Sequence, residues 1–160
     1  MLGRTYDNQN CSAARALEII GERWSLLIMR DAIFRGHTKF TEFQRQLGIA
    51  PNVLASRLES FVAAGLMRTR RYTEHGDLHE YVLTPKGLDL QPVIIALTRW
   101  GDRWAAPDGP PVIFRHNACG GHVDQRLSCA DCGTSPPPAD VRATPGPGLS
   151  KTARRETTAS

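Results

Sequence analysis

Residues 39–81 read KFTEFQRQLGIAPNVLASRLESFVAAGLMRTRRYTEHGDLHEY, and this stretch decides the fold. Its first part, Phe40–Leu47, is a short amphipathic segment, and Gly48 interrupts the pattern. A second helix is predicted from Pro51 to Ala64, because proline suits the first helical position. Residues 66–73 then form a strand-like run with three arginines. Two helices joined by a tight turn and followed by a basic hairpin are the plan of a winged helix-turn-helix. We therefore predict a mostly α fold with a small β-hairpin (α+β) that binds duplex DNA.

The predicted helix 51–64 has two different faces. At 100° per residue, Leu54, Leu58 and Phe61 share an apolar face that suits a core. The opposite face carries small and hydrogen-bonding side chains instead of a dense Lys/Glu pattern, which suits a helix that reads base edges in the major groove. The residues expected nearest to the bases are Asn52, Val53, Ser56 and Arg57.

Basic side chains surround this helix in the sequence. The strand-like runs 66–73 and 79–83 are separated by the turn residues Glu74–Asp77. A solvated basic strand is the alternative reading of the hairpin alone, but its position directly after the two helices favours DNA contact. We predict that phosphates are held by Lys39, Thr41, Arg70, Arg71 and His75.

Local signals place the remaining helices of this region. Ser12 can cap a helix that runs over residues 13–20, and a second helix is expected over about residues 23–34. Thr41 and Gln44 have the spacing of a capping box. Ala50 lacks the side-chain oxygen that would cap the helix from Pro51, at a cost of about 1 kcal/mol.

A long helix is expected from Pro85 onward, with a possible kink at Pro92. Its apolar stripe covers four turns and consists of Leu90, Val93, Ile94, Leu97, Trp100 and Trp104. The stripe could be ordinary core, but a domain of about 80 residues covers little of it, and tryptophan is enriched at interface centres. We therefore predict a homodimer, which would also present two recognition helices about 34 Å apart to DNA.

Composition supports a globular protein that does not span a membrane. The chain has 160 residues, 41% apolar and 22% charged, and a net charge of +4. No apolar run reaches the roughly 18 residues that a membrane span needs. The N-terminus lacks the apolar core of a signal peptide, so a cytoplasmic location is expected.

Three of the four cysteines lie in a compact segment after a Pro/Gly-rich linker at residues 105–111. His116-x2-Cys119 and Cys129-x2-Cys132 have the spacing of two metal-ligand pairs, which predicts a zinc-ribbon-like segment at residues 112–135 with a structural zinc ion. His122 competes with His116 for the fourth ligand position, and a thiol cluster without metal is the alternative. Residues 136–160 have the composition of a disordered tail.

Residues 11–105 together resemble the HxlR-type transcriptional regulators, a bacterial branch of the MarR-like winged-helix proteins. The resemblance is carried by Cys11, residues 14–17 (ARAL), 21–31 (GERWSLLIMRD), 40–44 (FTEFQ), 54–58 (LASRL), 65–66 (GL) and 81–87 (YVLTPKG). It implies a homodimer on a pseudo-palindromic operator. It also implies that a cysteine near the N-terminus, here Cys11, responds to oxidants, quinones or aldehydes.

Cys11 stands ahead of a helix, where the helix N-terminus and a cation such as Arg15 would favour its thiolate. A small buried cysteine without reactivity is the alternative. A thiol-dependent enzyme would need a base, and no histidine is near Cys11 in the sequence.

The leading function is therefore a DNA-binding regulator that represses by occluding a promoter and is not an enzyme. The alternative is a winged-helix protein-interaction module with a structural zinc site, which would expose an apolar patch on the recognition helix.

Overall fold

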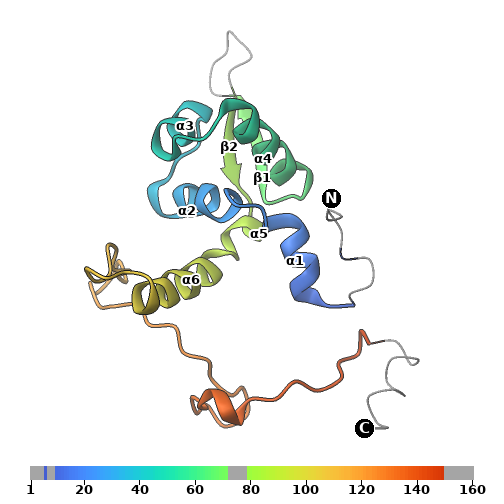
Figure 1. Ribbon diagram of the computed structural model, residues 1–160, viewed down its shortest axis with the longest axis vertical. Coiled ribbons are helices and arrows are strands. Elements are labelled where there is room, and N and C mark those ends of the chain that lie inside the picture. Colours follow the sequence, from blue (N-terminus) through green and yellow to red (C-terminus); the bar gives the residue numbers. More distant parts are fainter. Residues whose placement is uncertain (1–5, 7–9, 72–78, 150–160) are drawn as a thin grey trace. The chain divides into compact units, whose positions relative to one another are not determined.

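The computed structural model describes residues 6, 10–71 and 79–149 and divides the chain into two units, with the boundary between His122 and Val123. This boundary falls inside the predicted zinc-ribbon-like segment 112–135. The described part of the second unit, residues 123–149, contains one short 3-10 helix, Pro138–Asp140, within the part that was predicted to be disordered. The first unit contains α1 (Ser12–Ile20), α2 (Ser25–Arg35), α3 (Phe40–Leu47), α4 (Pro51–Ala63), β1 (Met67–Arg71), β2 (His79–Leu83), α5 (Pro85–Leu88) and α6 (Gln91–Trp104) (Figure 1).

The core of the first unit lies between α2, α3, α4 and the hairpin. Leu54, Leu58 and Phe61 of α4 are fully buried, which confirms the predicted inner face of this helix. They pack with Ile28, Met29, Phe43 and Met67 in one hydrophobic cluster. Burial of each large side chain stabilises the fold by about 1.5–3 kcal/mol. The opposite face of α4 is therefore held toward solvent by the packing of the inner one.

The hairpin is antiparallel, with Met67 opposite Leu83 and Arg71 opposite His79. An isolated β-bridge between Lys39 and Glu80 lies beside this two-stranded sheet, and the Tyr81 amide donates to the Thr38 carbonyl at 2.7 Å. The segment that leads into α3 is therefore hydrogen-bonded to β2. The strand predicted over 66–73 is described only to Arg71, and the predicted turn 74–77, with His75, lies outside the described residues.

The predicted capping box of Thr41 and Gln44 is wrong. Helix α3 begins at Phe40, one residue before Thr41, so its third residue is Glu42. The Glu42 carboxylate accepts hydrogen bonds from the backbone amides of Thr38 and Lys39, at 2.9 and 3.0 Å. Those two donors lower the pKa of Glu42. By contrast, Ala50 precedes α4 without a side-chain cap, as expected.

The predicted long helix from Pro85 is divided in two. Thr84 caps the short helix α5 by accepting a hydrogen bond from the Gly87 amide. Helix α6 then starts at Gln91, so Pro92 lies in its first turn, where a missing N–H removes no helical bond and causes no kink. None of the helices that the structure describes is long and apolar enough to cross a membrane.

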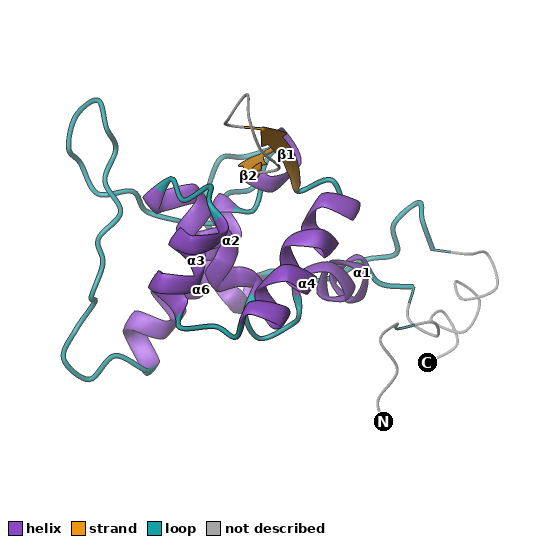
Figure 2. Ribbon diagram, turned by 90° about the horizontal axis from the view of Figure 1, so that it is seen from above, coloured by secondary structure: helices purple, strands orange, loops and turns teal. Residues whose placement is uncertain are grey.

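Figure 2 shows α1 beside α4. Residues of both helices line a shared hollow of about 670 Å³, with Leu17 and Glu18 on α1 and Ser60 and Ala63 on α4. The helix that follows Cys11 therefore adjoins the second helix of the helix-turn-helix.

Candidate nucleic-acid interface

The outer face of α4 is open to solvent where the sequence predicts base contacts. Asn52 and Ser56 are exposed, and Val53 is 36% exposed. Ser60 donates its hydroxyl to the Ser56 carbonyl at 2.7 Å, so it is held against its own helix. The exposed groups are small and can donate or accept hydrogen bonds, as major-groove readout requires.

Arg57 lies differently from its three neighbours on this face. Its side chain is only 15% exposed, and Nη1 lies 4.0 Å from Oε1 of Glu22, in the connection between α1 and α2. The Glu22 side chain is 56% exposed. Arg57 and Glu22 both line the hollow between α1 and α4. The Arg57 side chain therefore lies beside the α1–α2 connection. Arg57 also lines a smaller hollow with Asn52, Val53 and Ser56, and its predicted base contact stays a prediction.

The wing presents its arginines on an exposed strand. Arg68, Arg70 and Arg71 of β1 are all exposed, in contrast to the buried Met67 at its start. Arg70 is held in place, because its Nε donates to Oε1 of Glu80 at 2.6 Å. The Arg70 guanidinium, with the Thr38 hydroxyl, holds the pKa of Glu80 below its usual range. Glu80 is a residue that the sequence reading missed, although its place opposite Arg70 in the hairpin could have indicated a cross-strand pair.

The start of α3 provides a second basic position. Lys39 and Thr41 are exposed at the N-terminus of this helix, where backbone amides favour anions. Lys39 also forms an isolated β-bridge with Glu80 of β2. The residues predicted to contact phosphates at the start of α3 and on β1 are therefore linked through Glu80.

Hydrogen bonds from Thr84 and Lys86, which the sequence did not predict, hold the C-terminal end of α4. Lys86 donates from Nζ to the Ala64 carbonyl at 2.7 Å, and the Thr84 hydroxyl donates to the Gly65 carbonyl at 2.6 Å. A Cβ added at Gly87 would lie 2.2 Å from the Leu66 carbonyl oxygen, so only glycine fits there. Residues 84–87 thus hold the C-terminal end of α4 against the segment that leads into α6.

The family of the chain follows from a family model, the HxlR-like helix-turn-helix, which matches residues 19–109. This chain belongs to the HxlR-like helix-turn-helix family. It is accordingly a transcriptional regulator with a helix-turn-helix DNA-binding fold, and it is not an enzyme.

Proteins similar to this HxlR-like chain are named as transcriptional regulators or transcription factors. The uncharacterized HTH-type transcriptional regulator Rv3095 of Mycobacterium tuberculosis is 45% identical over 139 residues, which cover 86% of this chain and 87% of the relative. A match of that extent reaches beyond residue 109 and includes residues 116–132. The crystal structure of PA1607, a candidate transcription factor, superposes with a TM-score of 0.77 at 38% identity and covers 87% of this chain and 97% of PA1607. The reduced form of the redox regulator HypR superposes with a TM-score of 0.53 at 26% identity, covering 58% and 92% of the two chains.

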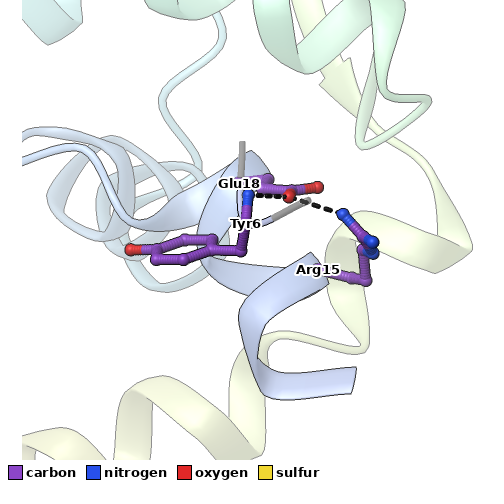
Figure 3. A network of polar contacts seen from close by, with 3 residues as sticks. All are labelled: Tyr6, Arg15 and Glu18. Atoms are coloured by element: carbon purple, nitrogen blue, oxygen red, sulfur yellow. Dashed lines mark hydrogen bonds and ion pairs between the residues drawn. The ribbon is translucent and has the colours of Figure 1, made fainter. Parts of the chain in front are cut away.

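Cys11 of this HxlR-like chain is exposed and directly precedes α1. It stands at the N-cap position that the sequence assigned to Ser12. The backbone amides of Ala14 and Ala13 at the start of α1 lower the pKa of the thiol. Arg15 does not take part in this, because its Nη1 donates to Oε1 of Glu18 at 2.7 Å, and the same oxygen accepts from the Tyr6 amide (Figure 3). The helix N-terminus therefore favours the Cys11 thiolate, as predicted, whereas the expected contribution of Arg15 is absent.

The first predicted ligand pair lies on a tight turn in the first unit. The His116 amide donates to the Gly121 carbonyl and the Gly120 amide donates to the His116 carbonyl, both at 2.8 Å. Gly120 has a φ of +69°, which other residues rarely adopt. The turn brings Nδ1 of His116 to 3.2 Å from Sγ of Cys119.

The second ligand pair lies on a turn of the same design in the second unit. The Cys129 amide donates to the Thr134 carbonyl and the Gly133 amide donates to the Cys129 carbonyl, both at 2.8 Å, and Gly133 has a φ of +70°. Hydrogen bonding, chiefly with Thr134, lowers the pKa of Cys132 to about 7. No group of three or more potential metal ligands gathers within the described ranges 10–71 and 79–149.

Proposed function

We propose that this chain is a transcriptional repressor that binds a pseudo-palindromic operator as a homodimer. Helix α4 would enter the major groove with Asn52, Val53 and Ser56 toward the bases. The observation that carries the proposal is the exposed, small and polar outer face of α4, set beside an exposed strand with three arginines. Repression would follow from occluding a promoter.

The exposed apolar side of α6 supports the homodimer. Leu97, Trp100 and Trp104 are 50%, 63% and 66% exposed, and Val93 is 45% exposed. Contiguous apolar surface of this kind is typical of a protein–protein contact. Its tryptophans are the residue type that most often dominates such contacts. A second copy of α6 presents the same surface and would bury it by two-fold symmetry.

The exposed thiol of Cys11 supports regulation by oxidants or electrophiles. Its pKa is lowered, so a larger fraction of it is the reactive thiolate at neutral pH. The similar protein HypR is a redox regulator. We propose that oxidation or alkylation of Cys11 changes how α1 packs beside α4 and thereby changes operator affinity.

We also propose a structural zinc ion with the ligands His116, Cys119, Cys129 and Cys132. The support is the donor set and the shared turn geometry of the two pairs, each observed within its own unit. Thiolates and imidazole are the ligands that structural zinc prefers. Metal analysis tests this: about one zinc ion per chain is expected, and Cys132→Ser should lose it whereas Cys11→Ser should keep it. A metal-free protein purified under reducing conditions would contradict it.

The alternative, a winged-helix module that binds protein through α4, has less support. Such a module would expose an apolar patch on the helix. On the outer face of α4 the neighbours of Val53 are the polar residues Asn52 and Ser56.

Binding of the purified protein to DNA upstream of its own gene, across a salt series, tests the proposed function. A specific complex should form whose affinity falls steeply with salt, because phosphate contacts release counterions. A protein without sequence preference even at low salt would contradict the proposal.

A further inference from the structure

We propose that Glu80 is the positioning residue of the wing, which holds the guanidinium of Arg70 for a DNA phosphate. The inference rests on the proposed function, because it names a residue on which that DNA contact depends.

The geometry of Glu80 differs from that of an ordinary surface carboxylate. The residue is only 9% exposed, and both of its carboxylate oxygens have partners. Oε1 accepts from Nε of Arg70 at 2.6 Å, and Oε2 accepts from the Thr38 hydroxyl at 2.9 Å. Glu80 therefore connects the wing strand β1 to the segment that leads into α3.

The backbone fixes the position of this carboxylate. Glu80 lies directly opposite Arg70 in the hairpin and forms an isolated β-bridge with Lys39. The next residue, Tyr81, donates its amide to the Thr38 carbonyl at 2.7 Å. Backbone pairing therefore places a basic residue on each side of Glu80.

The hydrogen bond to Nε leaves the outer end of the Arg70 guanidinium available. The Arg70 side chain is 56% exposed, so its remaining N–H groups can reach solvent or a phosphate. A free arginine side chain loses conformational entropy when it is fixed. Glu80 removes part of that cost before DNA arrives, since the side chain is already ordered.

Electrostatics alone predicts the opposite role for Glu80. A carboxylate beside a phosphate-binding surface repels DNA, so its removal should strengthen binding. A positioning role predicts that its removal weakens binding although the protein becomes more positive. The sign of the change therefore separates the two accounts.

The test compares Glu80→Gln with wild type by fluorescence anisotropy on the operator DNA across a salt series. We expect an at least fivefold loss of affinity and a salt slope shallower by about one, as for one lost phosphate contact. Asp89→Asn is the matched control, because Asp89 is an exposed carboxylate at the end of α5 and its replacement changes the net charge equally. The control should bind as wild type or slightly more tightly.

Comparing Glu80→Gln in the wild-type and Arg70→Gln backgrounds separates the loss of positioning from a general loss of fold. In an Arg70→Gln background, Glu80→Gln should change affinity less than twofold, because the side chain it positions is gone. Thermal unfolding of each variant identifies any loss of fold, and Arg70→Gln alone should reproduce the reduced salt slope.

Two outcomes would overturn the positioning role: equal or tighter binding by folded Glu80→Gln, or an equally large loss in both backgrounds. Failure of the proposed function is distinguishable, since wild type itself would then show no sequence-specific complex.

Discussion

Arg57 and Glu22 face each other across the junction of the recognition helix and the α1–α2 connection, with Nη1 and Oε1 4.0 Å apart. A pair of this length with an exposed carboxylate contributes about 0–1 kcal/mol. Arg57 can therefore leave Glu22 for DNA at little cost. The pair also means that any base contact by Arg57 competes with Glu22.

Replacement of Glu22 should therefore strengthen operator binding. Glu22→Gln removes the competing carboxylate and one like charge near the phosphates, so we expect a two- to fivefold gain in affinity at low salt with little change in melting temperature. Anisotropy titration measures it. A loss of affinity would show instead that Glu22 holds Arg57 in its binding position.

Gly87→Ala should destabilise the first unit by about 1–3 kcal/mol, because the new methyl group meets the backbone carbonyl of Leu66. Gly101→Ala is the control, since a Cβ at Gly101 in α6 has open space around it and alanine favours a helix. Denaturant unfolding should show a loss for the first variant and none for the second. Equal stability of both variants would mean that Gly87 and the Leu66 carbonyl do not pack as closely as the structure shows.

Cys11 should react at a lower pH than an ordinary thiol. Its pKa is lowered by the amides of Ala14 and Ala13, so alkylation by iodoacetamide should rise with pH around a midpoint below the usual value of about 8.5. Peptide mass spectrometry separates Cys11 from the other three cysteines, and Arg15→Gln should leave the midpoint unchanged. A midpoint at or above 8.5 would contradict the helix effect.

Glu42 should stabilise the fold at neutral pH and lose that effect in acid. Its pKa is lowered in the folded state, so the stabilisation is complete above the unfolded pKa of about 4.3 and disappears as pH falls through the folded value. Glu42→Ala should cost about 0.5–2 kcal/mol at pH 7, as for the loss of a helix cap. Unfolding at a series of pH values should show this difference shrinking below pH 4. A constant difference would mean that the charged carboxylate is not the cap.

Helix faces with a periodic apolar pattern could be predicted from the sequence alone. The inner face of α4 was predicted correctly because Leu54, Leu58 and Phe61 repeat at helical spacing and are fully buried. The exposed residues Asn52 and Ser56 followed from the same geometry.

Features that depend on contacts between residues far apart in the chain could not be predicted from the sequence. The segment Phe40–Leu47 was predicted with the bounds of α3, but its capping residues were not, because Glu42 accepts from amides that precede Phe40. The Glu80–Thr38 hydrogen bond joins residues 42 positions apart, so the sequence pattern could not indicate it. The sequence also could not indicate that the Arg57 side chain lies 4.0 Å from Glu22.

Footprinting of the operator by the purified protein tests whether a dimer of this chain reads DNA through α4. We expect protection of two half-sites whose centres are about 34 Å, or one helical turn, apart on one face of the DNA. The protection should be lost when Asn52 and Ser56 are both replaced by alanine. Protection of a single half-site, or an unchanged footprint in that double variant, would contradict a dimer that reads DNA through α4.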